Sequence, residues 1–408
     1  MVNSQTYFLV QKVSRKIECK MMKETVTLKG NIITEQGVGE GYIRLENGII
    51  SSLPVARPGG RIIDFDQNYI APGFIDLHIH GIHYSLVDKG PADLEKICRI
   101  LPQYGVTGFL PTVSPKPAGI DSEFISGLSG LNPEGAEILG FHLEGPFLKI
   151  TGALPPEAVS ESNSSRVGSL IEACQPYRAV FSISPDVKGI ETLLPLMTRN
   201  NTPAFITHTA ASVAETRTAI ELGARHATHF YDVFPCPPVS DPGVRPCGAV
   251  EAILADERVS VDFILDGVHV DPVAVKVALL CKLKGPGCVC LISDSNVGTG
   301  LEPGRFTFDT MGEIEFAYKG APARMVKDNT LAGSGLTLDQ ALRNAMKWLD
   351  IDLPEAVKMV STNPAKVLGV DNRKGKLKEG YDADIVVLNR ELQVIRTWIK
   401  GKECYFNS

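Results

Sequence analysis

The sequence predicts an α/β protein, a closed (β/α)₈ TIM barrel with a small β-sandwich domain formed from both termini. Two observations support the barrel: eight short apolar runs rich in β-forming residues follow one another between residues 72 and 296, and stretches with helical spacing separate most of them. A third supports the small domain, because both ends of the chain resemble short strands with Gly and Asn turns. The 408 residues, 44% of them hydrophobic, suffice for such a core.

The two ends of the chain are expected to pair with each other. Residues 1–21 are interpreted as an N-terminal extension, since they are polar and basic and show no clear periodicity. Residues 22–70 contain the strand-like runs VTLKGNIIT, GYIRLENGIISSL and RIIDFDQNYIAPG, and residues 375–408 contain similar ones. We expect these two segments to form the small β domain, with the barrel, residues 71–374, between them.

The barrel strands are expected where the apolar runs lie, and most of these runs are continuous, as in strands buried on both faces. The eight runs are 73–80, 105–113, 136–145, 179–186, 203–209, 226–233, 261–270 and 288–295. Apolar residues at helical spacing predict helices over 92–104, 211–224, 271–284 and 336–350, the last with Thr337 as N-cap. Residues 301–330 are expected to form a β excursion over the barrel mouth.

Charge and composition exclude several classes of partner. The net charge is −6 and no basic run is present, which argues against nucleic acid and anionic membrane surfaces. No apolar stretch reaches the roughly 18–20 residues that a membrane span requires. The N-terminal YFLV is followed at once by QKVSRK, without a signal-peptide core, and the nine cysteines show no disulfide spacing. We therefore expect a cytoplasmic protein with reduced thiols.

Histidines and carboxylates gather where the predicted strands end, which in such a barrel is where functional groups lie. The first strand ends His78-Ile79-His80, and a side-chain period of two places both imidazoles on the same side. The other strand ends supply Glu144, His208, His229, His269 and Asp294. One such residue alone is commonly structural, but the whole set at one mouth indicates a divalent metal site. Neutral imidazoles with carboxylates suit Zn²⁺, with Fe²⁺, Mn²⁺ and Co²⁺ as alternatives.

The remaining three histidines are interpreted as structural. His83 lies past the first strand, and His226 begins the sixth. His142 lies two residues before Glu144 and is also kept as a candidate for substrate binding.

Seven segments in order resemble one enzyme family over residues 22 to 400. They are APGFIDLHIHG, GFHLEGPFL, ATHFYDVFP, DGVHVD, LISDS, LAGSGLTLDQALRN and the closing STNPAKVLGV with KGKLKEGYDADIVVLN. Together they resemble the N-acetylglucosamine-6-phosphate deacetylases of the amidohydrolase superfamily, and HLEGP is the most specific of them. The resemblance implies the amidohydrolase type of barrel, a small-molecule amino-sugar substrate and a homodimer.

The resemblance also implies a ligand set. Glu144, His208 and His229 would hold the principal metal, and members that keep both histidines of H-x-H use them for a second ion, so one or two ions per chain are expected here. Hydantoinase-like relatives place a bridging carboxylated lysine at the end of strand 4. Here that strand ends SISPD, with no lysine, and Glu144 is available as the bridge.

The expected reaction is hydrolysis of the acetamide of an N-acetylated amino-sugar phosphate, most simply of N-acetylglucosamine-6-phosphate to glucosamine-6-phosphate and acetate. The metal would activate a water and polarise the carbonyl. Asp294 would accept the water proton and pass it to the departing amine. His269 would hold the substrate or stabilise the oxyanion, and by resemblance it contacts the sugar phosphate end.

The phosphate-binding segment departs from the family. Where the family has H-L-[YF]-N-A-M, with main-chain and Asn groups on the substrate, this chain places Asp232 at the Asn position, followed by Val233. The family's phosphate-binding Arg, which often reaches across a dimer, corresponds to Ser240 or Asp241. The candidates for substrate binding are therefore Asp232 and Val233 themselves.

Two explanations of this departure remain open. Arg245, or Arg305, supplies the missing cation, so that the phosphate is still bound. Alternatively the substrate is a different amino-sugar phosphate or an unphosphorylated N-acyl compound, and a related amidohydrolase acting on a cyclic amide or an acylated amino acid belongs to this second group. A catalytically silent binding protein on the same fold would predict a missing ligand or base, and none is missing.

Overall fold

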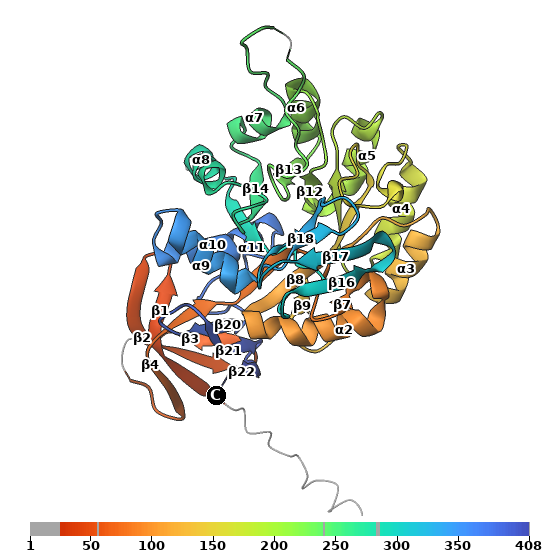
Figure 1. Ribbon diagram of the computed structural model, residues 1–408. Coiled ribbons are helices and arrows are strands. Elements are labelled where there is room, and N and C mark those ends of the chain that lie inside the picture. Colours follow the sequence, from red (N-terminus) through yellow and green to blue (C-terminus); the bar gives the residue numbers. More distant parts are fainter. Residues whose placement is uncertain (1–24, 55–56, 240, 283–285, 408) are drawn as a thin grey trace, which may run out of the picture.

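The computed structural model describes residues 25–54, 57–239, 241–282 and 286–407 (Figure 1). The extension expected at residues 1–21 and the position of Ser240 lie outside these ranges. No helix in the described ranges combines the length and the apolar character that crossing a membrane requires.

The barrel consists of parallel strands in the order β15-β14-β13-β12-β11-β10-β8-β5. Their bounds are β5 Phe74–Ile79, β8 Val106–Val113, β10 Phe141–Phe147, β11 Ala179–Ile183, β12 Ala204–Ile206, β13 Ala224–Ala227, β14 Ser260–Ile264 and β15 Val289–Ile292. Hydrogen bonds join the first strand to the last: the His80 N–H donates to the Ser295 carbonyl and the Asp294 N–H to the His78 carbonyl, both at 3.0 Å. Each predicted apolar run therefore overlaps a barrel strand, and the predicted barrel fold is confirmed.

Helices surround the barrel, as Figure 1 shows. They are α2 Pro91–Ile100, α3 Ile120–Ser129, α4 Ser164–Ala173, α5 Ile190–Met197, α6 Val213–Glu221, α7 Ala249–Ala255, α8 Pro272–Lys282, α9 Leu338–Trp348, α10 Leu353–Val360 and α11 Thr362–Val367. Because the helices cover the outer face, residues such as Phe109, Phe205 and Phe263 in the strands are 0% exposed. Thr337 occupies the predicted N-cap position of α9, although its side chain makes no capping hydrogen bond.

The small domain takes strands from both ends of the chain, which lie together at the lower left of Figure 1. They are β1 Val26–Thr34, β2 Gly37–Glu46, β3 Ile49–Ser52, β4 Ile62–Pro72, β20 Ile385–Leu388, β21 Val394–Ile399 and β22 Lys402–Phe406. They form one sheet in the order β22-β21-β20-β4-β1-β2-β3, in which β4 pairs antiparallel with β20. Leu28, Ile43 and Trp398 belong to a core of this domain's own.

A second small sheet lies at the C-terminal end of the barrel. Its strands are β16 Gly304–Phe308, β17 Gly312–Phe316, β18 Pro322–Met325 and β19 Leu331–Ser334, all antiparallel. The Ser334 N–H donates to the Asp294 carbonyl at 2.7 Å, which fixes β19 against the end of β15. This is the β excursion expected over residues 301–330. Three two-residue strands, β6 Gly81–Ile82, β7 Ser85–Leu86 and β9 Glu137–Ile138, complete the set in the described residues.

A partly buried group of charges links the small domain to the barrel. Lys374, 2% exposed, lies 2.8 Å from a Glu137 carboxylate oxygen at the start of β9 and 3.0 Å from Asp382, and it also contacts Asp384 just before β20. Arg373 reaches the same Glu137 at 2.9 Å and Asp382 at 2.6 Å. We call these five residues the junction cluster.

Candidate metal centre

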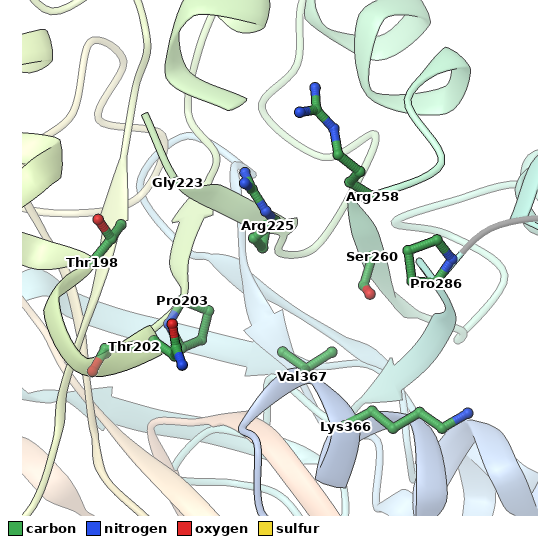
Figure 2. A pocket seen from close by; sticks show the side chains of 11 residues that line it. Thr198, Thr202, Pro203, Gly223, Arg225, Arg258, Ser260, Pro286, Lys366 and Val367 are labelled. Carbon is green, nitrogen blue, oxygen red and sulfur yellow. The ribbon is translucent and has the colours of Figure 1, made fainter. Parts of the chain in front are cut away.

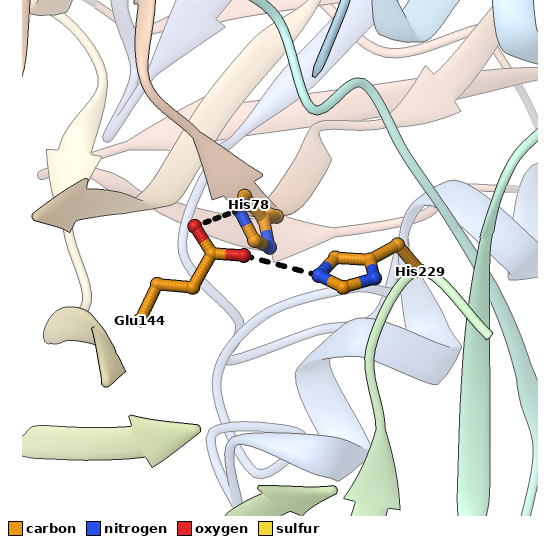
Figure 3. Close-up of side chains that lie close together, drawn as sticks. All are labelled: His78, Glu144 and His229. Atoms are coloured by element: carbon orange, nitrogen blue, oxygen red, sulfur yellow. Dashed lines mark hydrogen bonds and ion pairs between the residues drawn. The ribbon is translucent and has the colours of Figure 1, made fainter. Parts of the chain in front are cut away.

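Six of the predicted side chains meet at the C-terminal ends of the barrel strands. They are His78 and His80 at the end of β5, Glu144 on β10, and His208, His229 and Asp294 just after β12, β13 and β15. All six are buried. Figure 3 shows how His78 and His229 approach the carboxylate of Glu144 from different sides.

Glu144 lies between two groups of imidazoles. Its Oε1 is 3.1 Å from Nε2 of His229 and 3.4 Å from Nε2 of His208. Its Oε2 is 3.1 Å from Nε2 of His80 and 3.5 Å from Nε2 of His78. On the far side, Oδ1 of Asp294 is 3.6 Å from both of the latter nitrogens. The cluster thus contains two overlapping sets of ligand atoms that share His78: with Glu144 and His229, and with His80 and Asp294.

The chemistry of these atoms fits a divalent cation. Oε2 of Glu144 and Oδ1 of Asp294 are buried and have no hydrogen-bond partner. His208 donates its Nδ1–H to the Ile150 carbonyl at 2.8 Å, because a carbonyl only accepts, and this leaves the Nε2 lone pair facing Glu144. Buried imidazole lone pairs and carboxylate oxygens within a few ångströms of one another suit Zn²⁺ or a similar ion.

The pKa values reflect how strongly the carboxylate and the imidazoles interact. Burial disfavours charge on Glu144, but the neighbouring His78, His208 and His229 outweigh it and hold the pKa of Glu144 well below its ordinary value. Burial likewise disfavours the imidazolium forms, yet Glu144 raises the pKa of His229 to about 10 and that of His80 to about 9. A cation competes with these protons for the same nitrogens, so its binding releases protons.

The backbone at these strand ends has an unusual conformation that the sequence did not reveal. His208, His229 and Asp294 have φ values of +50°, +32° and +44°, in the left-handed region that residues other than glycine seldom adopt. Glycine allows a close approach nearby: a Cβ on Gly152 would lie 3.1 Å from Cε1 of His208, and one on Gly333 would lie 2.8 Å from the Asp294 carbonyl oxygen. The three turns aim their side chains at the cluster at a cost in backbone strain.

A small cavity of about 40 Å³ opens onto the cluster. Its other lining residues are Ala153, Leu154, Asp232, Val233, Phe308, Met311, Leu331, Ala332 and Gly333. The sheet β16–β19 therefore covers the site. A larger cavity of about 440 Å³ lies at the opposite end, where β12, β13 and β14 begin (Figure 2). No histidine, carboxylate or thiol lines that cavity, so it is not a candidate for the metal centre despite its larger volume.

The structure places some of the candidates for substrate binding in the cavity and others outside it. Asp232 and Val233 line the small cavity, and none of the residues that line it is Lys or Arg. Arg245 is 77% exposed at its side chain and pairs with Glu251 at 3.1 Å, and neither it nor the exposed Arg305 lines the cavity. The structure therefore leaves Asp232 without a lysine or arginine beside it in the cavity lining.

His269 lies close to the site without lining the cavity. Its Nδ1 pairs with Asp266 at 2.7 Å, and its buried Nε2 has no partner. Burial opposes its protonation, but the carboxylate of Asp266, helped by Asp232 and Asp294, raises the pKa of His269. One ring nitrogen is thus held in place and the other is free to contact a substrate.

His142 packs beneath the cluster rather than in the cavity. Its ring lies 4.5 Å from that of His78, its Nδ1 is 3.2 Å from the Leu77 carbonyl and its Nε2 is 2.7 Å from the Ser182 hydroxyl. Burial and the nearby His78 hold the pKa of His142 well below its ordinary value. This geometry supports the structural interpretation of His142. His83 and His226 also have internal partners, Tyr104 and Asp262 respectively, each at 2.7 Å.

Several residues that support the cluster were missed by the sequence reasoning. Thr207, Thr228, Asp262 and Asp266 contact the histidines from behind. For Asp262 a signal was present, because it is the one charged residue inside the buried run SVDFI of β14. An isolated carboxylate in such a run requires buried partners.

The comparisons with known proteins agree with this fold and site. The amidohydrolase family model matches residues 204–404. The chain is 30% identical over 385 residues to the N-acetylgalactosamine-6-phosphate deacetylase of Escherichia coli, covering 92% of this chain and 98% of the relative. It is 29% identical over 401 residues to the N-acetylglucosamine-6-phosphate deacetylase of Bacillus subtilis, covering 95% and 98%.

A solved structure matches the fold over nearly the whole chain. It is the crystal structure of N-acetyl-D-glucosamine-6-phosphate deacetylase from Mycobacterium smegmatis, with a TM-score of 0.83 and 25% identity, covering 93% of this chain and 99% of that one. The barrel, its inserted sheet and the shared terminal domain thus recur together in a relative. The chain belongs to the N-acetylglucosamine-6-phosphate deacetylase family of the amidohydrolase superfamily, whose members hydrolyse carbon–nitrogen bonds.

Proposed function

We propose that this protein is a metal-dependent deacetylase that hydrolyses the acetamide of an N-acetylated amino-sugar phosphate. The first substrate to test is N-acetylglucosamine-6-phosphate, with glucosamine-6-phosphate and acetate as products. The observation that carries the proposal is the cluster of four imidazoles and two carboxylates at one barrel mouth, in which two buried carboxylate oxygens accept no hydrogen bond. The names of the relatives support the same substrate class.

The ligand assignment within the cluster follows its two overlapping halves. Glu144, His208 and His229 would hold one ion, and His78, His80 and Asp294 a second, with Glu144 between them. Zn²⁺ is the first choice for this mixture of imidazole and carboxylate, with Fe²⁺, Mn²⁺ and Co²⁺ to be compared. When bound, a divalent ion supplies a water of lowered pKa and polarises the acetamide carbonyl.

Side chains of the protein carry out the proton transfer and hold the substrate in this proposal. Asp294 is the general base in this proposal, because its Oδ1 is buried and unpartnered beside the cavity, and it accepts the proton of the attacking water. The same proton then passes to the nitrogen of the scissile bond, so that the amine leaves neutral and acetate remains. His269, held by Asp266, offers its free Nε2 to the substrate oxygens. Leu154, Phe308 and Met311 limit the access of other water molecules.

The test is acetate release by purified protein loaded with Zn²⁺. We expect acetate and free amine in equal amounts from N-acetylglucosamine-6-phosphate, and loss of the activity after treatment with a chelator. Asp294→Asn should lower kcat by about 10²- to 10⁴-fold, as removal of a general base does. Absence of acetate with every N-acetylated amino sugar, phosphorylated or not, would refute the proposal.

Asp232 favours a second candidate function for the same site. This function is deacetylation of an N-acyl compound that carries no phosphate. Three carboxylates, Glu144, Asp232 and Asp294, line the cavity without a lysine or arginine. A phosphate dianion close to Asp232 would be repelled unless a cation intervenes. The ratio of kcat/KM for N-acetylglucosamine-6-phosphate and for N-acetylglucosamine decides between the two candidates, with a cyclic amide and an N-acetylated amino acid as further substrates.

The first candidate function, deacetylation of an amino-sugar phosphate, includes a homodimer. In that arrangement the exposed Arg245 is the residue that we assign to meet the phosphate across the interface. Light scattering on the purified protein measures the oligomeric state. Arg245→Ala should raise KM for the phosphorylated substrate alone, and an equal effect on the unphosphorylated sugar would contradict this role.

A further inference from the structure

A fully buried carboxylate, Asp262 on β14, lies directly beneath the metal cluster. Its Oδ2 is 2.7 Å from Nε2 of His226. Its Oδ1 accepts two hydrogen bonds, from the His229 N–H at 2.6 Å and from the Thr228 hydroxyl at 3.2 Å. Asp262, Thr228 and His226 are all 0% exposed, so water does not compete for these contacts.

The hydrogen bonds in this group have only one consistent direction. An ionised carboxylate only accepts, so the Thr228 hydroxyl must donate its single proton to Asp262. The Thr228 oxygen is then left as an acceptor, and Nδ1 of His78 lies 3.3 Å from it. His78 must therefore carry its proton on Nδ1 and present the Nε2 lone pair to the cluster.

The tautomer of His78 decides whether its Nε2 can hold an ion. Nε2 of His78 faces Nε2 of His80 at 3.2 Å and Oε2 of Glu144 at 3.5 Å, where a proton on that nitrogen would block an ion. The hydrogen bond from the His229 N–H to Oδ1 of Asp262 holds the main chain of His229. This residue has a φ of +32°, a strained conformation that persists only when its surroundings fix it. One carboxylate thus acts on two different strands of the site.

We propose that Asp262 and Thr228 are positioning residues that fix the tautomer of His78 and the strained main chain of His229 before a metal ion arrives. The inference rests on the proposed function, since it concerns the ion that His78 helps to hold. Groups behind a metal ligand that fix its tautomer typically contribute about 10- to 100-fold to metal affinity. Neither residue touches the substrate, so the effect should appear in metal binding first.

The test uses two substitutions of Thr228 in the full chain. Thr228→Val keeps the shape and removes the hydroxyl, and we expect it to weaken binding of the His78-held ion by about 10- to 100-fold. Thr228→Ser restores the hydroxyl and should return the affinity to that of wild type. Zn²⁺ stoichiometry at buffered free-metal concentrations, with a competing chelator, gives the readout. Wild-type affinity in Thr228→Val would overturn the proposal.

A direct measurement covers the case in which Thr228→Val does not fold. Protein labelled with ¹⁵N-histidine reports which ring nitrogen of His78 carries the proton, with His78→Gln to assign its signals. We expect a proton on Nδ1 and none on Nε2, in both the metal-free and the Zn²⁺-loaded protein. A proton on Nε2 in the metal-free protein would overturn the proposal.

The two proposals fail in different ways. Wild-type protein that binds no divalent ion and releases no acetate removes the proposed function, whereas the tautomer of His78 is still measured in that protein. Wild-type protein that binds Zn²⁺ and is active, alongside a Thr228→Val variant of equal affinity, removes only the role of Thr228 and Asp262.

Discussion

Glu144 is the residue on which both halves of the cluster depend. Its two carboxylate oxygens face different histidine pairs, His208 with His229 and His78 with His80. Interactions with His78, His208 and His229 hold the pKa of Glu144 well below its ordinary value, so it is an anion at neutral pH. A neutral side chain of the same shape would leave both groups of imidazoles without their shared partner.

Glu144→Gln tests this dependence. We expect the variant to fold but to lose bound Zn²⁺ at both positions, because an amide supplies one oxygen and no charge where a carboxylate supplies two. The metal content after dialysis is the measurement, with Glu157→Gln, in the segment after β10, as the matched control. Retention of a full complement of Zn²⁺ by Glu144→Gln would contradict the bridging role.

Asp232→Asn tests the charge at the cavity. Removing one anion next to the substrate should raise kcat/KM for N-acetylglucosamine-6-phosphate relative to N-acetylglucosamine, on the order of tenfold, because the repulsion of the phosphate falls. Increasing salt should shrink the difference between variant and wild type, since salt screens exposed charges. An unchanged ratio of the two specificity constants would show that Asp232 does not meet the phosphate end.

At this scale the sequence predicted the residues of the candidate site but not the residues that support them. The rule that functional groups follow barrel strands identified Glu144, His208 and His229 without any structure. The partners behind them depend on which face of a strand a residue occupies and on contacts between residues far apart in the chain, such as that of Thr228 with His78. The left-handed φ values had no signal either, because they occur at His and Asp rather than at Gly.

At the scale of the elements, helix α6 begins a few residues after His208 of the candidate site, and its first turn is capped by its own residues. The Ser212 hydroxyl accepts from the Glu215 N–H at 3.2 Å, and the Glu215 carboxylate accepts from the Ser212 N–H at 2.8 Å. This reciprocal pair satisfies two main-chain donors that a helix start otherwise leaves unpaired. Helix α9 differs, because its N-cap Thr337 makes no such bond.

These two helices provide a matched pair of substitutions. Ser212→Ala should lower the free energy of unfolding by about 1 kcal/mol, as loss of a capping hydroxyl does. Thr337→Ala should cost clearly less, since its hydroxyl caps nothing. Midpoints of denaturant unfolding compare the two. An equal loss in both variants would mean that the capping bond at Ser212 contributes little.

The strands were predictable, but six of the ten α-helices in the described residues were not, for identifiable reasons. Continuous apolar runs bounded by turns stand out against a charged background, so each barrel strand was found. Helix α5 contains Pro195 in its interior, and α3 contains Gly127 and several serines, which weaken the helical signal in the sequence. Packing of these helices against the barrel, rather than their intrinsic propensity, stabilises them.

Across the whole molecule, the junction cluster connects a residue in the first half of the barrel with four residues near the C-terminal end of the chain. Glu137 belongs to the barrel, whereas Asp382 and Asp384 lead into β20 of the small domain. Lys374 and Arg373 lie between them and pair with both sides. The relative placement of barrel and small domain therefore depends on ionised carboxylates.

This dependence predicts a loss of stability in acid. Burial alone would raise the pKa of Glu137, but Lys374 and Arg373 outweigh it and lower that pKa to about 2, from an ordinary value of 4.5. Because the folded pKa is depressed, the stabilisation is fully present above the ordinary value and is lost as the pH falls from there to about 2. The contribution is on the order of 2 kcal/mol.

Unfolding measured between about pH 6 and pH 2.5 in wild type and in Glu137→Gln isolates this contribution, since the other carboxylates titrate in both. We expect the difference in stability between the two proteins to be largest near neutral pH and to shrink towards the acid end. A difference that stays constant over this range would show that Glu137 does not retain its charge in the folded state.

The seam between the first and last barrel strands has a consequence for biosynthesis. His78 and His80 leave the ribosome early, yet Asp294 and the hydrogen bonds that join its strand to theirs come more than two hundred residues later. A nascent chain released before this point carries most of the imidazoles but no closed ring of strands to hold them. Translation therefore has to pass residue 294 before the ring of strands can close and all six side chains of the candidate site can meet.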